Sequence, residues 1–244
     1  DPDDTLTQVN RGFFTMSGLT RLEGTVANVA PANMRARLAK GIYTTIGLSD
    51  VPVGTGSTGG VSETTARTDT LQAVIDFPRN MRLTRALLNH LWKRSTMVGD
   101  DVLAHYDLTP ERSKPYDFRF DPRILADTHE VERDGDALFY RALSSKEVPE
   151  KSLKLILTGS MTDAANWLRD HTDKFVEKVG VVAMMGGVHI ENGEVWKDAE
   201  GYMVPDERAQ NNKYDMVSSA YLHRTLQECN IPFIALRKET AYAA

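Results

Sequence analysis

The sequence lacks the features that mark several large classes of protein. It has a single cysteine, Cys229, among 244 residues, so no internal disulfide can form and a disulfide-stabilised extracellular scaffold is excluded. No apolar run approaches membrane-spanning length, and no signal-peptide pattern opens the sequence. The net charge is −5 and no run of lysine and arginine offsets it, which argues against a surface that binds nucleic acid. We therefore expect a cytoplasmic protein whose partners include neither membranes nor nucleic acids.

Several catalytic and nucleotide-binding motifs are also missing. The sequence has no Gly-x-Gly-x-x-Gly or P-loop pattern to hold a dinucleotide or triphosphate, and no Gly-x-Ser-x-Gly nucleophile elbow. The histidines are scattered, at positions 90, 105, 129, 171, 189 and 223, and give no zinc-ligand spacing. Cys229 lies in a helical, leucine-containing stretch, and we interpret it as a small core residue rather than a nucleophile.

The composition and the order of elements are those of one α/β domain. Hydrophobic residues make up 41% of the chain and charged residues 26%, which is typical of a globular protein. Short apolar strands alternate with helical patterns, and this predicts a Rossmann-like domain with a mostly parallel sheet and helices on both faces. The expected strands are 21–29, 50–54, 152–157, 181–185 and 231–236. The expected helices are 31–46, 81–108, 136–143, 162–169, 175–179 and 214–228, with Asp136 as the cap of the third.

We expect residues 1–244 to form a single domain, with residues 55–134 as a divergent region of loop and helix. Residues 54–68 are rich in Gly, Ser and Thr, which predicts an exposed loop. The sequence starts on an acidic motif with no apolar strand before it, and it stops just after a strand. From this we expect a chain that is truncated at both ends.

The acidic start of the chain offers oxygen ligands for a cation. Asp1, Asp3 and Asp4 place three carboxylates within four residues, and such a cluster is solvated, protonated or gathered round a cation. Ca²⁺ prefers six to eight oxygen ligands. A solvated acidic tail is the alternative for four terminal residues.

Polar residues also follow the expected strands. Asn28 ends the first strand, Thr158 follows the strand at 152–157, and Asn211, Asn212 and Asp215 precede a helix. In open parallel sheets, ligands bind in the loops at the carboxyl ends of the strands. Oxygen ligands with side-chain amides beside them suit a hard cation and a hydroxylated substrate such as a sugar. Asn211, Asn212 and Asp215 are also good candidates for helix capping.

Four segments carry a resemblance to a known family. They are Asp1-Pro2-Asp3-Asp4-Thr5-Leu6; Gly24-Thr25-Val26-Ala27-Asn28-Val29 with Asp50-Val51-Pro52-Val53; Leu157-Thr158-Gly159-Ser160-Met161-Thr162-Asp163 with Val181-Val182-Ala183-Met184-Met185-Gly186-Gly187; and Asn211-Asn212-Lys213-Tyr214-Asp215. In their order and spacing they resemble the inosine-uridine-preferring nucleoside hydrolases. Those are calcium-dependent enzymes that cleave the N-glycosidic bond of ribonucleosides.

The resemblance implies a cofactor, Ca²⁺, and a role for each matching residue. Asp4, Asp3 and the carbonyl of Thr158 would bind the ion, and Asp1 or Asp3 would take a proton from a metal-bound water. Such a water is a competent nucleophile near neutral pH, and the transition state would resemble an oxocarbenium ion. Asn28 and Asn211 would hold ribose hydroxyls, with Asn212 as the alternative to Asn211. The expected partner is a nucleoside or another ribosyl small molecule.

The sequence also departs from the family pattern. The acidic opening is two residues short, and Ala209-Gln210-Asn211 stands where the family has Glu-Phe-Asn, which removes a carboxylate that Glu207 would have to replace. The family's later His-Asp pair has no counterpart before Ala244.

These departures motivate an alternative function, a catalytically weakened binding protein. The forms around Asn211, Ser160 and the C-terminal end resemble a diverged branch that includes type III effectors of plant pathogens. Those proteins are delivered into host cells, so this alternative adds a host protein or a second copy of the chain as a partner. A third alternative is an unrelated, calcium-stabilised α/β domain.

Overall fold

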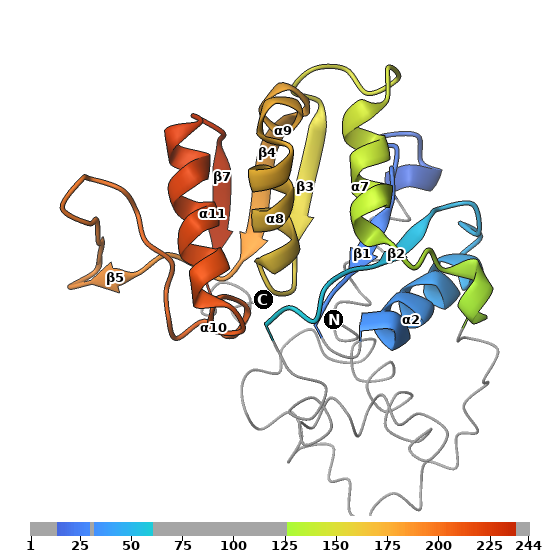
Figure 1. Ribbon diagram of the computed structural model, residues 1–244, viewed down its shortest axis with the longest axis horizontal. Helices are drawn as coiled ribbons and strands as arrows, with labels where there is room; N and C mark the ends of the chain where they lie inside the picture. The colour runs from blue at the N-terminus through green and yellow to red at the C-terminus, as the bar shows by residue number, and fades with distance from the viewer. Residues whose placement is uncertain (1–13, 30–31, 61–125, 238–244) are drawn as a thin grey trace, which may run out of the picture.

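The computed structural model describes residues 14–29, 32–60 and 126–237. Figure 1 shows these segments as helices and strands in chain order. The elements are β1 (Thr25–Ala27), α2 (Ala32–Thr45), β2 (Val53–Thr55), η3 (Thr128–Glu130), α7 (Gly135–Ser144), β3 (Leu153–Leu157), α8 (Thr162–Asp170), α9 (Thr172–Lys178), β4 (Val179–Met185), β5 (Ile190–Glu191), β6 (Glu194–Val195), α10 (Gln210–Lys213), α11 (Met216–Glu228) and β7 (Phe233–Leu236).

The main strands form two parallel sheets. β1 pairs with β2, and β3, β4 and β7 form the second sheet in that order. Strands and helices alternate along the chain, so each parallel step is made by a helical crossover. Within the described residues, β1 and β3 are the facing edges of the two sheets, and neither pairs with a further strand there.

Helices cover both faces of the β1–β2 sheet. Successive side chains of a strand point to opposite faces, and Val26 packs in the core cluster of α7 whereas Ala27 packs with α2. Val53 likewise joins the α2 cluster, while a Cβ on the next residue, Gly54, would lie 2.8 Å from Gly135 of α7. This alternation confirms the expected sandwich of a parallel sheet between helices.

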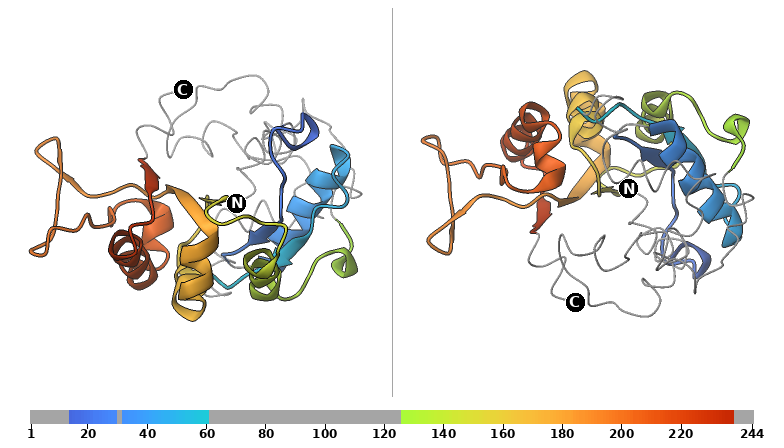
Figure 2. Two further views of the ribbon diagram at one scale, coloured as in Figure 1. Left: turned by 90° about the horizontal axis from the view of Figure 1, so that it is seen from above. Right: turned by 90° about the horizontal axis from the view of Figure 1, so that it is seen from below.

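The larger core lies between the β3–β4–β7 sheet and the helices α7, α8, α9 and α11. Figures 1 and 2 show α7, α8 and α11 side by side on one face. Phe139 of α7 and Trp167 of α8 stack at 4.0 Å, and Phe175 of α9 is completely buried beside them. The other face of this sheet presents exposed side chains, among them Ile156 and Ile234.

A hairpin projects from the sheet after β4 (Figure 1). β5 and β6 are antiparallel, and Asn192 and Gly193 between them have φ of 52° and 86°. Two consecutive positive φ values are what a type I′ hairpin turn requires, and Asn-Gly is its preferred sequence. The strands expected from the sequence do not include β5 and β6, because strands of two residues give no periodic signal.

The structure corrects two further details. Asp134, rather than Asp136, caps α7, since its side chain accepts from the backbone N–H of Ala137 at 2.9 Å. Asp136 instead accepts from Trp167 Nε1 at 2.7 Å. The first residues of the expected exposed loop are partly buried, because Ser57 and Gly59 pack onto the ends of β1 and β3.

The expected helix at 81–108 and the acidic residues Asp1, Asp3 and Asp4 lie outside the described residues. No described helix has the length and apolar character to cross a membrane.

Candidate functional site

The carboxyl ends of β1 and β3 lie together, as expected for strands of parallel sheets. Asn28 directly follows β1 and Thr158 directly follows β3. Both line a cavity of about 680 Å³ between the two strands, with Gly159, Ser160 and Asp163 at the same end. The cavity runs along β3 from Ser152 to Thr158 and so includes the edge where α/β proteins bind ligands.

Asn28 joins the two sheets at this edge. Its Nδ2 donates to the carbonyl of Ser160 at 2.8 Å and to Asp163 Oδ2 at 2.6 Å. A Cβ on Gly159 would lie 2.5 Å from Asn28 Oδ1, so no side chain larger than hydrogen fits there without movement. Glycine at position 159 thus allows β3 to turn closely past Asn28.

Asp163 is a buried carboxylate with three side-chain and backbone donors. It is only 3% exposed, and it lies at the start of α8. Besides Asn28, Ser57 donates to it twice, from the backbone N–H at 2.8 Å and from Oγ at 2.9 Å. Hydrogen bonds to an ionised group are stronger than neutral ones. Asp163 therefore ties the loop after β2 and the end of β1 to α8.

The backbone next to Asn28 is strained. Val29 has φ of 67°, a left-handed conformation that a β-branched residue adopts rarely and at a cost. Val29 is 5% exposed, and a Cβ on Gly59 would lie 2.8 Å from its side chain. The tight contact between these two loops holds Val29 in place.

Asn211 binds the carboxyl ends of β3 and β4. Its Nδ2 donates to the carbonyl of Thr158 at 3.2 Å and to that of Met185 at 2.9 Å. Asn211 is partly exposed. With the amide nitrogen on two carbonyls, Oδ1 is the atom left for another partner.

Asn212 is buried behind this edge. Its side chain is 0% exposed, and Nδ2 donates to the carbonyls of Gly186 at 2.7 Å, Asp206 at 3.0 Å and Gly187 at 3.3 Å. A Cβ on Gly186 would lie 2.4 Å from Asn212 Oδ1, which explains the glycine at the end of β4. Asn212 therefore orders the loop after β4, and its contact with a ligand stays a prediction.

A chain of hydroxyls runs from the end of β3 to α11. Thr162 Oγ1 donates to Asp215 Oδ2 at 2.8 Å and lies 2.9 Å from Ser160 Oγ. Asp215 caps α11 by accepting from the N–H of Ser218 at 3.0 Å, as its sequence position predicted. Burial raises the pKa of Asp215, but the hydrogen bonds from Ser218 and Thr162 outweigh burial and hold the pKa below its ordinary value.

His223 lies deeper in α11 and is completely buried. Its Nδ1 is 2.8 Å from the carbonyl of Ser219, and its ring meets Phe233 edge-on at 5.7 Å. Burial lowers the pKa of His223, and the backbone carbonyls beside it only partly oppose this. The histidine is thus a neutral core residue near pH 7.

The described residues supply only part of a calcium site. Thr158 offers a carbonyl oxygen and the two asparagines offer amide oxygens, whereas the carboxylate of Asp163 is already engaged. The three aspartates expected to bind the ion, Asp1, Asp3 and Asp4, lie outside the described residues.

A possible acidic metal-binding cluster occurs elsewhere. Asp127, His129 and Glu130 offer ligand atoms within 4.8 Å of one another, and all three are exposed. They lie beyond the outer edge of β2, where Glu132 bridges Gly54, and so on the far side of β1 from Thr158. Asp127 and Glu130 already form a reciprocal capping box around η3, which accounts for their proximity.

Sequence reasoning missed Ser57 and the role of Asp163. Asp163 stands at the start of an expected helix, where an acidic residue is common, and Ser57 stands in a Gly/Ser/Thr-rich stretch. Neither position carries a local sequence signal for this contact.

The parallel sheets, their flanking helices and the asparagines at the carboxyl edge define an α/β protein with a nucleoside hydrolase-like fold. The chain is similar to the type III effector protein XopQ, whose crystal structure is a complex with adenosine diphosphate ribose. The TM-score is 0.65 and the identity 27%, over 98% of this chain and 53% of XopQ. It is also similar to the effector protein XOO4466, with a TM-score of 0.61 and 25% identity over 100% of this chain and 54% of that one.

This chain thus spans little more than half of the length of either effector. No protein-family model and no curated protein sequence matches it.

Proposed function

We propose that this protein binds a ribosyl compound, a nucleoside or a nucleoside diphosphate ribose, at the carboxyl edge of β1 and β3, and that it belongs functionally with effectors rather than with efficient hydrolases. The observation that carries the proposal is the fixed orientation of Asn28 in the wall of the cavity. Its Nδ2 is held by Ser160 and Asp163, so Oδ1 is left to accept a hydrogen bond from a sugar hydroxyl.

The size and chemistry of the cavity support a nucleotide-sized ligand. Sites for small molecules typically enclose about 300–1,000 Å³ and combine apolar walls with a few polar groups. This cavity has about 680 Å³ and pairs Asn28 and Asp163 with apolar residues such as Leu157 and Trp167. Asn211 does not line the cavity itself, but its amide contacts the carbonyl of Thr158, which does, so a ligand that reaches Thr158 would find a second acceptor in Asn211 Oδ1.

The comparison with XopQ supports the same ligand class. That effector was crystallised with adenosine diphosphate ribose, and it covers 98% of this chain at 27% identity. Ala209 stands where the nucleoside hydrolase family has a glutamate. The loss of that carboxylate agrees with a protein that binds its ligand without hydrolysing it. A host protein remains the proposed partner for a role inside a host cell.

Isothermal titration calorimetry with adenosine diphosphate ribose tests the proposal. We expect saturable binding that Asn28→Ala weakens at least about fivefold, since a polar ligand group that loses its partner costs about 1–3 kcal/mol. Asn166→Ala is the matched control, because this asparagine lies on α8 and does not line the cavity. Absence of binding by the folded wild-type protein, or equal affinity of Asn28→Ala, would reject the assignment.

The second candidate function is calcium-dependent hydrolysis of an N-glycosidic bond. It is favoured by the position of the Thr158 carbonyl, which lies at the cavity beside Asn211. When bound, Ca²⁺ would supply a water of lowered pKa. Thr158 would contribute its carbonyl and Asn28 would orient the sugar, while Asp4, Asp3 and Asp1 stay predicted ligands and base.

Release of free base from inosine and uridine, followed by chromatography with and without a chelator, separates the two candidates. Hydrolysis predicts release that stops in EGTA and in Asp4→Ala. Binding alone predicts no release and a heat of ligand binding that persists in both. An EGTA-insensitive release would contradict the calcium mechanism.

A further inference from the structure

The projecting hairpin is part of a longer arm, residues 188–205, that lies against α11. Val188 bridges Pro205 at its base, and Lys197 bridges Met203 further out. An isolated hairpin of this size is marginally stable at best. Its position must therefore come from contacts with the body of the protein.

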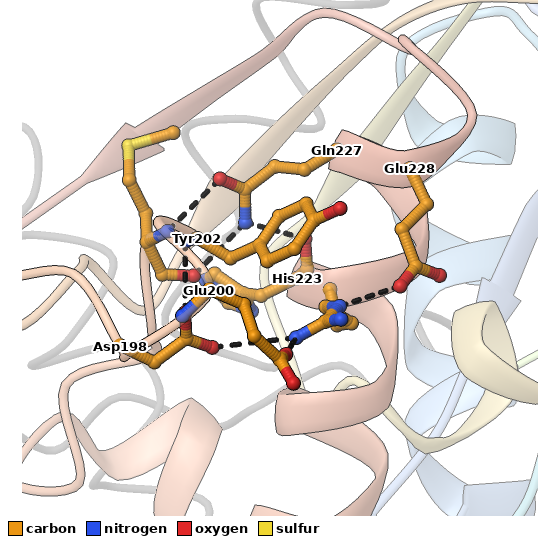
Figure 3. Close-up of polar contacts among 8 residues, drawn as sticks. Asp198, Glu200, Tyr202, His223, Gln227 and Glu228 are labelled. Atoms are coloured by element: carbon orange, nitrogen blue, oxygen red, sulfur yellow. Dashed lines mark hydrogen bonds and ion pairs between the residues drawn. The ribbon is translucent and has the colours of Figure 1, made fainter.

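Two residues of α11 fix the arm (Figure 3). Gln227 pairs with the backbone of Met203, accepting from its N–H and donating to its carbonyl, both at 2.9 Å. Arg224 lies over the ring of Tyr202 at 3.8 Å and pairs with Asp198, Glu200 and Glu228. These contacts hold the arm against α11, although it carries no part of the main sheets.

A second cavity, of about 490 Å³, lies between the arm and α11. Its walls include His189, Trp196 and Tyr202 from the arm and Met216 from the helix. Trp196 meets His189 edge-on at 5.8 Å and stays 40% exposed. The cavity therefore combines aromatic faces with open access to solvent.

Acidic residues outnumber basic ones on the arm and on the part of α11 that holds it. Asp198, Glu207 and Arg224 line the cavity, and Glu200 and Glu228 pair with Arg224. The rest of the arm carries Glu191, Glu194 and Lys197, so these residues comprise six carboxylates and two cations. The neighbouring pair of Asp206 and Arg208 is balanced. Anionic partners such as nucleic acids and acidic membranes would be repelled, whereas a cationic partner would be attracted.

We propose that the cavity between the arm and α11 is a docking site for an arginine-rich peptide segment of a partner protein. A guanidinium of the partner would stack on Trp196, hydrogen-bond to Glu207 and place its alkyl stem against Met216. Arg224 already shows how this surface holds a guanidinium, over an aromatic ring and among carboxylates. Trp and Arg are also the residues that most often dominate binding energy at interfaces.

Fluorescence anisotropy with a labelled peptide, Gly-Arg-Arg-Ser-Arg-Arg-Gly, tests the proposal. The same peptide with citrulline in place of arginine keeps the shape and removes the charge. We expect saturable, salt-sensitive binding of the arginine peptide and none of the citrulline peptide. Equal binding of both peptides, or no binding at low salt, overturns the proposal.

Variants distinguish the cavity from general attraction to an acidic protein. Trp196→Ala is expected to weaken binding about fivefold, and Trp196→Ala with Glu207→Gln at least about tenfold, from the lost cation–π contact and ion pair. Tyr221→Ala and Glu150→Gln are matched controls outside the cavity and should bind like the wild type. Equal loss in controls and cavity variants overturns the assignment. So does sedimentation showing that the chain dimerises through Trp196, because a second copy would then be the occupant.

Discussion

Asn28 and Asn212 both lie at the carboxyl edge of a parallel sheet, yet their surroundings differ. Asn28 is partly exposed, lines the larger cavity, and is held by Asp163, a residue of α8. Asn212 is completely buried, and its amide is held by three backbone carbonyls around the end of β4. The same residue type thus connects two sheets beside a cavity in one place and holds the loop after β4 in the other. We therefore expect substitutions at the two positions to separate ligand binding from stability.

The largest expected effect on stability is that of Asn212→Ala. It removes a donor from three backbone carbonyls, of which that of Gly187 keeps the N–H of Asp206 and that of Asp206 is only partly buried. One unsatisfied buried polar group costs about 1–3 kcal/mol, so we expect a loss of about 3 kcal/mol in the free energy of unfolding. Urea denaturation measures it. The control Asn166→Ala should lose less than about 0.5 kcal/mol, as is usual away from such networks. If Asn212→Ala loses no more free energy of unfolding than the control, the hydrogen bonds of Asn212 to the loop after β4 do not stabilise the fold.

Asp163→Asn is expected to lower both the stability of the fold and the affinity for the ligand. Its new amide group would face donors of Asn28 and Ser57, so we expect a loss of about 2 kcal/mol in stability and about tenfold weaker binding of adenosine diphosphate ribose. A double-mutant cycle with Asn28→Ala sharpens the comparison, because residues in one hydrogen-bond network couple by about 0.5–3 kcal/mol. Strict additivity of the two substitutions would show that Asp163 does not position Asn28.

The hydrogen bonds around the buried Asn212 continue into α11 and reach His223, and this histidine predicts a pH dependence of stability. Ser219 Oγ donates to the carbonyl of Asn212 at 3.2 Å, and the Ser219 carbonyl contacts His223. Burial lowers the pKa of His223 in the folded protein. In the unfolded chain the same imidazole is protonated below about pH 6.5, so between that pH and the folded-state pKa the unfolded chain binds one more proton than the folded protein. Stability should be full above that pH and fall as the pH drops toward the folded-state pKa, by at most about 1.4 kcal/mol per pH unit.

Denaturation midpoints between pH 7.5 and 5 check this effect. His223→Gln should flatten the profile, whereas the exposed His129→Gln should leave the slope unchanged. An unaltered slope in His223→Gln would show that another group is responsible.

The sequence allowed the parallel α/β fold and the edge residues Asn28, Thr158 and Asn211 to be predicted. Apolar runs such as 181–185 predict where the strands end. Because the strands of a parallel sheet have their carboxyl ends at one edge, the loops that follow them are expected to lie together there. The hairpin could be predicted only from Asn192-Gly193, since its strands are too short for a periodic pattern. The contact of Asp163 with Ser57 joins residues 106 positions apart, and no local pattern specifies it. The sequence favoured Asn211 over Asn212 only by its spacing to Asp215, because burial depends on how α10 packs against the end of β4.

The measurement that tests the account most directly is the response of the asparagine side-chain amide resonances to adenosine diphosphate ribose. In nuclear magnetic resonance spectra of ¹⁵N-labelled protein, the amide signals of Asn28 and Asn211 should shift saturably with one common affinity. Those of Asn212 and Asn166 should stay in place. Unshifted signals of Asn28 and Asn211 at saturating ligand, or a shift confined to Asn212, would contradict a ribosyl site at the edge of β1 and β3.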